Sequence, residues 1–308
     1  ILMPSFFMIK YLQYGLALVV GSLYLVFIPD DDVTNIVALT AILFFGVPHG
    51  AIDHKIHIKF SKKSNVKKFI LIYVLVGLGF LLWWVLMPLK ALLIFIILSA
   101  YHFGQELIED IAETPKDPIL NLSWGLIVLV SPIIFAFNEL LPTLNFIGSQ
   151  SISRIPKDLQ VITVLVLHLL AYAYLGYLFI KGVIHKVAVF RLILFSIYLM
   201  LSYYMLPFIV AFALYFVLFH SINAMRHQFF WMKDRTADYT FAAFLKDLSP
   251  FTLLTIVGMS GLIYYLDPAD WSVFFTYFFV FISLLTLPHA MLFDELYLSK
   301  KTSNQPKG

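Results

Sequence analysis

Long apolar runs separated by short polar segments are the dominant pattern along this chain. Each run has about the 20 residues that an α-helix needs to cross the hydrocarbon core of a bilayer. We therefore expect an all-α fold, a polytopic membrane bundle of about ten transmembrane helices, at residues 10–29, 33–54, 68–87, 89–108, 119–138, 158–180, 190–206, 207–229, 251–267 and 271–297. No internal repeat or linker divides the chain, so we expect residues 1–308 to form a single membrane domain.

Composition excludes several other classes of protein. With 61% hydrophobic and 13% charged residues, the chain is not an ordinary water-soluble domain. It has no cysteine, which excludes thiolate metal ligands and iron–sulfur clusters. The net charge of +3 is small and no basic tract is interleaved with aromatics, so we expect no nucleic-acid partner. The first apolar run is followed by Asp30, Asp31 and Asp32 and lacks a small-residue cleavage site, so we expect it to be retained as a span.

The basic residues predict the orientation of the bundle. If the N-terminus is cytoplasmic and ten helices follow, 18 of the 21 Lys and Arg residues fall on the cytoplasmic side, all except Lys90, Arg154 and Lys157. Cytoplasmic loops carry such an excess of positive charge. The sequence therefore predicts that both termini are cytoplasmic (N-in/C-in), in a multi-pass protein of the cell inner (plasma) membrane.

Four histidines recur inside the apolar runs: His49, His102, His220 and His289. They fall on the second, fourth, eighth and tenth predicted helices, which all run from outside to inside. Each lies about 13–17 residues from the outer end, roughly 20–25 Å at 1.5 Å per residue. An imidazole in a membrane is costly unless it is hydrogen-bonded, paired or coordinated. Their common depth predicts one metal site on the cytoplasmic side of the core.

His227 is a fifth candidate ligand. It follows His220 by seven residues, which places both on one helix face but about 10.5 Å apart along the axis. Both could reach one ion only if the helix were kinked or irregular between them. Depth alone favours His289 as the fourth ligand. The remaining histidines have simpler interpretations: His54 as interfacial, His168 as a structural hydrogen-bonder, and His57 and His185 as solvated.

Carboxylates follow the histidines at close spacing. Asp53 and Glu106 come four residues after His49 and His102, and Asp294 comes five after His289. An acid one turn away can accept the second ring N–H of a ligating histidine and fix its tautomer. We therefore expect Asp53, Glu106 and Asp294 to support the ligands, whereas Asp110 is expected to be solvated at a helix end.

The residue types narrow the chemistry. Imidazoles without thiolates suit iron, zinc or copper. The His-Glu-x-x-His motif of hydrolytic zinc sites is absent from the sequence, and an all-histidine shell would leave open positions for dioxygen. The 31 Phe and 17 Tyr residues include enough aromatics to line a pocket for a long, flat, apolar substrate.

Four short motifs carry a resemblance to a known family. They are Gly46-Val47-Pro48-His49-Gly50-Ala51-Ile52-Asp53, His102-Phe103-Gly104, Phe219-His220-Ser221, and Leu287-Pro288-His289 with Asp294. In this order and spacing, over about residues 40–298, the chain resembles the Brp/Blh family. Its members are bacterial and archaeal membrane β-carotene 15,15'-dioxygenases that supply retinal to microbial rhodopsins.

The resemblance implies a non-haem Fe(II) enzyme that uses O2 to cleave the central double bond of β-carotene into two retinal molecules. It implies no further cofactor and no catalytic residue beyond the metal ligands, with a functional link to a retinal-binding rhodopsin. His49, His102 and His220 match metal-site histidines of the family. Family members often carry a second histidine four residues after the third, where this chain has Ala224, and His227 is the nearest equivalent. The fourth ligand is thus open between His227 and His289, and so is a mononuclear or dinuclear centre.

Two other functions could use the same intramembrane histidines. A membrane di-iron hydroxylase or desaturase needs about eight histidines in clustered boxes, more than the five or six plausible ligands here. A transporter or haem-binding membrane protein would use intramembrane histidines to relay protons or to hold haem.

Overall fold

The computed structural model describes residues 3–27, 30–60, 65–112, 117–149, 151–266 and 271–303, and within these ranges it contains helices and no strand. The helices are α1 (Met3–Phe27), α2 (Asp31–Ala41), α3 (Asp53–Phe60), α4 (Val66–Leu86), α5 (Pro88–Ile111), α6 (Pro118–Phe135), α7 (Phe137–Gly148), α8 (Lys157–Ile180), α9 (Lys186–Met205), α10 (Phe208–Leu214), α11 (Ile222–Lys233), α12 (Phe241–Leu266) and α13 (Trp271–Ser303). The predicted all-α fold is confirmed.

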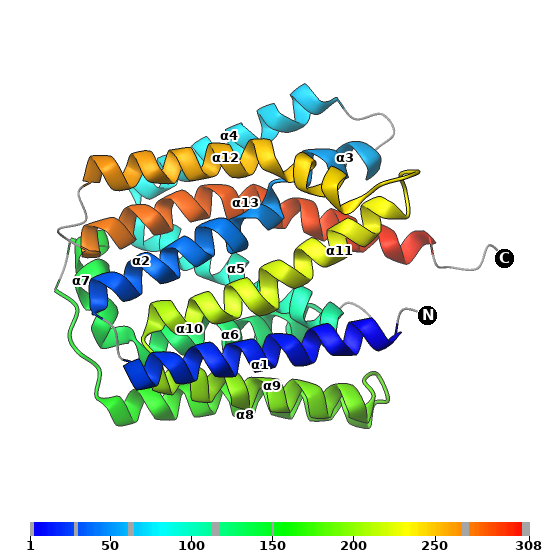
Figure 1. Cartoon of the computed structure of the whole chain (residues 1–308). Coiled ribbons are helices and arrows are strands. Elements are labelled where there is room, and N and C mark those ends of the chain that lie inside the picture. The colour runs from blue at the N-terminus through cyan, green and yellow to red at the C-terminus, as the bar shows by residue number, and fades with distance from the viewer. Residues whose placement is uncertain are drawn as a thin grey trace.

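Nine helical segments of the described chain are long and apolar enough to cross a membrane. They correspond to the second through tenth predicted spans. The first predicted span, 10–29, falls in α1, where the apolar stretch Leu12–Phe27 is shorter than the other nine. The long helices run nearly side by side in one bundle, and α1 begins at the same end at which α13 finishes (Figure 1). The chain is therefore a multi-pass helical membrane protein.

One helix was not expected from the apolar pattern. α7 lies across the end of the bundle where α12 ends and α13 begins (Figure 1). Its 12 residues are too few to span a bilayer, so a search for membrane-length runs passes over it. Side-chain amides hold the following loop against it: Asn138 donates to the Ile155 carbonyl at 2.8 Å, and Asn145 accepts from the Ile152 N–H at 2.7 Å.

Helices α5 and α6 approach each other more closely than ordinary side chains allow. A Cβ at Gly104 would lie 1.7 Å from the carbonyl oxygen of Asn121, and one at Gly125 would lie 1.6 Å from that of Ala100. Small residues permit such backbone contact between membrane helices. The contact holds the turn of α5 that carries His102 against α6.

Two spans depart from α-helical hydrogen bonding beside a histidine. After α2, a π-helical turn η1 (Ile42–Gly46) passes into the 3-10 turn η2 (Val47–Gly50), which contains His49. Between α10 and α11, the π-helical segment η3 (Tyr215–Ser221) contains His220. π-Helical segments are rare and frequently occur at functional sites.

Candidate metal centre

The imidazole rings of His49, His102, His220 and His289 form a closed ring of contacts inside the bundle. His49 lies 4.8 Å from His220 and 4.9 Å from His289 between ring centroids. His102 lies 5.4 Å from His220 and 5.2 Å from His289. All four side chains are buried, with at most 7% exposed. The common depth predicted from the sequence thus places these residues together.

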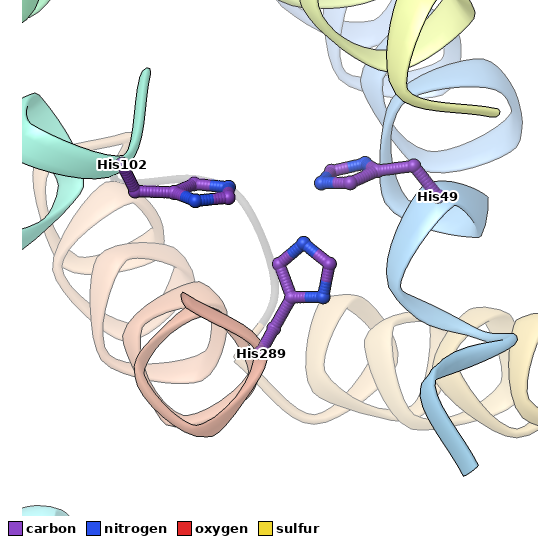
Figure 2. Close-up of side chains that lie close together, drawn as sticks. All are labelled: His49, His102 and His289. Atoms are coloured by element: carbon purple, nitrogen blue, oxygen red, sulfur yellow. The ribbon is translucent and has the colours of Figure 1, made fainter. Parts of the chain in front are cut away.

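The ring nitrogens are spaced as a metal ion would require. His49, His102 and His289 form one group of potential ligands, and His102, Glu106 and His220 form a second, with the ligand atoms of each group within 4.8 Å of one another. Nitrogens on opposite sides of one ion, each about 2 Å from it, lie about 4 Å apart. Figure 2 shows His49 and His102 approaching from opposite sides with His289 reaching between them. The donor set therefore fits an ion with small side-chain adjustments.

Two carboxylates contact the outer ring nitrogens. The Nδ1 of His289 lies 2.7 Å from Asp53 Oδ2, and the Nδ1 of His220 lies 2.6 Å from Glu106 Oε2. Both acids are buried, with 3% of each residue exposed. Because Nδ1 of each histidine faces a carboxylate, Nε2 is the nitrogen left for an ion, as in carboxylate–histidine–metal arrangements.

These pairings correct the expectation from local spacing. Asp53 was expected to support His49 and Glu106 to support His102, each one turn away on its own helix. Instead, each acid contacts a histidine on another span. Asp294, the third expected support, lies outside the residues whose side chains are described.

His49 is held by backbone and neutral groups. Its Nδ1 contacts the carbonyl oxygen of Gly46, where the π-helical turn gives way to the 3-10 turn, and lies 3.3 Å from Ser221 Oγ. Gln228 donates from Nε2 to the His49 carbonyl oxygen at 2.6 Å. Sequence reasoning did not find these contacts, because they depend on irregular backbone and on a neighbouring span.

His227 is oriented toward a different partner. Its Nε2 lies 3.4 Å from Asp110 Oδ1, and 32% of its side chain is exposed. The π-helical segment ends at Ser221 and the chain is α-helical from Ile222 to Lys233, so from Ile222 onward no irregularity turns His227 toward the ion that His220 would hold. The expectation that Asp110 is solvated is wrong: its side chain is 8% exposed, and Arg226 binds it at 2.8 Å.

The other histidines lie outside the ring of four. His168 is buried, and its Nδ1 contacts the Val164 carbonyl oxygen at 2.8 Å, as expected of a structural residue. His185 is exposed. His57, expected to be solvated, stacks on Phe69 at 4.5 Å. His54 is half-buried against Phe251.

Two cavities lie near the histidines, but histidine side chains line only the larger one. The larger, about 430 Å³, is lined by His49, His289 and mostly apolar side chains of α4, α12 and α13. The smaller, about 80 Å³, is lined almost entirely by apolar side chains. Phe216 lines both, and its ring stacks on His220 at 5.3 Å. Nothing in the sequence pattern distinguishes this residue from the other 30 phenylalanines.

Comparison with known proteins shows the family to which this chain belongs. Residues 40–297 match the family model described as Beta-carotene 15,15'-dioxygenase, and all four clustered histidines fall inside the match. A curated relative named Beta-carotene 15,15'-dioxygenase, from Uncultured marine bacterium 66A03, is 34% identical over 103 residues, which are 32% of this chain and 37% of the relative. The match thus spans little more than a third of the length of the curated relative. No solved structure matches this chain. Because the family model covers most of its length, the chain belongs to the β-carotene 15,15'-dioxygenase family.

Proposed function

We propose that this protein cleaves β-carotene at its central 15,15' double bond with O2 and releases two retinal molecules. The observation that supports this most directly is the buried ring of four histidines next to apolar cavities inside a membrane bundle. The reaction breaks one carbon–carbon double bond and places one atom of the dioxygen on each new aldehyde, so no further oxidant or reductant is needed.

The residues we assign to the metal are His49, His102, His220 and His289. They would hold Fe(II), which when bound supplies the activation of dioxygen. Four neutral imidazoles suit that ion and leave positions for a small co-substrate. We assign the fourth position to His289 and not to His227, because His289 contacts both His49 and His102 whereas His227 is turned to Asp110.

The other residues of the site would orient the ligand histidines and shield the reaction from water. Asp53 and Glu106 fix the rings of His289 and His220 through Nδ1. The apolar cavity walls exclude water and accept a polyene, which offers no group for hydrogen bonding. Positioning is the main demand on the protein, since the reaction needs no acid or base side chain.

The proposal extends to the membrane location of the protein, the source of its substrate and the protein that would use its product. We place the protein in the inner (plasma) membrane with the metal site toward the cytoplasmic side, as the distribution of Lys and Arg favours. β-Carotene would arrive from the bilayer, where it dissolves. Retinal is the product, so a retinal-binding rhodopsin is the class of protein that would consume it.

The decisive experiment uses the full chain, purified in detergent and supplied with Fe(II), O2 and β-carotene. We expect two retinal molecules for each β-carotene consumed and label from isotopic dioxygen in both aldehydes. A Soret band in the active protein would instead support haem binding, and hydroxylated or desaturated products in place of retinal would support the di-iron hydroxylase or desaturase alternative. Absence of retinal from protein that holds iron would reject the proposal.

The ligand assignment is tested by substitution. His49→Ala, His102→Ala, His220→Ala and His289→Ala should each lose most of the bound iron and the activity, whereas His227→Ala should retain both. Iron content measured beside retinal formation checks this. Wild-type iron in the His289→Ala protein together with iron loss in His227→Ala would reverse the assignment of the fourth ligand.

A further inference from the structure

The two cavities meet beside the histidine ring. Among the residues that line both are Phe216, Ile282 and Thr286, which form a shared wall. The ring of Phe216 stacks on His220 at 5.3 Å and lies 5.7 Å from His49. An elongated molecule that extends from one cavity into the other would therefore pass Phe216, the residue that contacts His49 and His220. We call the cavity of about 430 Å³ the outer lobe and that of about 80 Å³ the inner lobe.

The outer lobe faces the lipid. Ile70 and Val74 of α4 and Leu254 of α12 line it, and these side chains are 38%, 49% and 65% exposed. Apolar side chains exposed on a membrane span contact the acyl chains. Both α4 and α12 pack against α13, and they are the least buried of the nine candidate spans. The outer lobe thus lies between two helices with weak attachment to the bundle.

The inner lobe extends the other way, along α5 and toward α7. Ser99 lines it one turn from His102, and Leu92 lines it ten residues before His102, about 15 Å away along the helix. Ile147 of α7 also lines this lobe, where α7 lies across the end of the bundle. The helix α7, which the apolar pattern did not predict, therefore closes the end of the inner lobe that is farther from the histidines.

We propose that the two lobes are the two halves of one substrate tunnel. β-Carotene enters from the bilayer between α4 and α12, and its leading half passes Phe216, Ile282 and Thr286 into the inner lobe. The end formed at α7 stops that half, so that the central double bond rests beside the histidines. This inference rests on the proposed function and adds to it the entrance and the element that selects the central bond.

The small volume of the inner lobe indicates which side chains must move when substrate binds. The volume of the inner lobe, about 80 Å³, is too small for half of a carotenoid, so its aromatic side chains must rotate as the arm enters. Phe275, Phe278 and Phe279 of α13 and Phe212 of α10 supply half of this aromatic lining. In the empty lobe these side chains make dispersion contacts with one another. When the arm enters, its own dispersion contacts with the same side chains replace them.

A matched pair of substitutions on α5 tests the inner lobe. Leu92 lines it and is 8% exposed, whereas its neighbour Leu93 is 57% exposed on the outside of the bundle. Leu92→Trp should shorten the lobe and Leu93→Trp should not. The two substrates are β-carotene and an apocarotenal with one β-ionone ring and a truncated second arm. The readouts are the rate of retinal formation from each substrate and the bound iron.

We expect Leu92→Trp to lower the ratio of β-carotene to apocarotenal turnover at least about tenfold, equivalent to about 1.4 kcal/mol, with iron content unchanged. Leu92→Phe, which adds less volume, should lower the ratio less. Leu93→Trp should keep the wild-type ratio. An unchanged ratio in both Leu92 variants, or an equal loss of both substrates, would overturn the inner-lobe assignment. If the wild-type protein cleaves neither substrate, the proposed function fails instead.

The entrance is tested separately on α12. Gly258 lines the outer lobe, and a Cβ there would lie 3.5 Å from Phe281, whereas a Cβ at Gly261 would meet nothing within 4 Å. Gly258→Leu should slow both substrates alike, because both must enter through the outer lobe, and Gly261→Leu should slow neither. Equal rates in Gly258→Leu and wild-type protein would exclude this route.

Discussion

Asp53 and Glu106 each bind a histidine of another span, so single side chains connect the helices that form the site. A buried carboxylate is costly in a membrane unless it is paired. Here the pairing orients the ring that would hold an ion. The sequence identified the four clustered histidines by their cost in an apolar run, and it identified both acids by their spacing from a histidine. The sequence could not predict which acid pairs with which histidine, because spacing along one helix does not indicate which neighbouring helix faces that helix.

The role of Asp53 predicts a graded loss of iron affinity. Asp53→Ala removes the acceptor for His289 Nδ1, and loss of such a partner typically weakens metal binding about 10–100-fold. Asp53→Asn keeps an oxygen acceptor without the charge and should lose less. Iron titration in the presence of a competing chelator measures both. Asp247, whose carboxylate lies 3.5 Å from Lys55, supplies the control Asp247→Asn, which should bind iron as the wild type does. Equal affinity in Asp53→Ala and wild-type protein would contradict the assignment.

Among the elements, the irregular turns were the least predictable part of the fold. The apolar runs specify where helices lie, but a π-helical turn changes only the hydrogen-bond register and leaves the hydrophobic pattern almost intact. Gly46 is the one local sign: a Cβ there would lie 2.5 Å from the Phe216 ring, so a larger residue at this position would force that ring to shift. Each of these turns directs a histidine into the bundle, and the regular helix after η3 directs His227 away.

The contact between α5 and α6 predicts a stability effect at Gly104. In Gly104→Ala the new Cβ would overlap the Asn121 carbonyl group, and backbone cannot move aside as a flexible side chain can. Overpacking costs about 1–3 kcal/mol, so the midpoint of thermal unfolding in detergent should fall. Gly79→Ala on α4 is the control, since its Cβ would meet nothing within 4 Å. A midpoint for Gly104→Ala equal to that of the control would mean that the two helices are not in close contact.

For the whole molecule, nine of the ten predicted spans and their sequence order match membrane-length helices of the described chain, because hydrocarbon thickness fixes the length of a span. Orientation is a further prediction from charge. Reporter fusions at Asp32 and Asn65, at the two ends of the second span, should report opposite sides, with Asn65 in the cytoplasm. The split of 18 to 3 basic residues is the reason. If both fusions report the same side, the predicted threading of the chain is wrong.

The four clustered histidines also have a consequence for the order of events during synthesis. They come from the second, fourth, eighth and tenth of the predicted spans, and His289 lies on the last described helix. A chain still being made therefore holds at most three of them until α13 has left the ribosome and joined the bundle. Binding of iron would then indicate that all the helices of the bundle have assembled. A nascent chain arrested before α13 should remain accessible to proteases that the finished, iron-loaded protein resists, because a ligand that binds only the folded state stabilises that state.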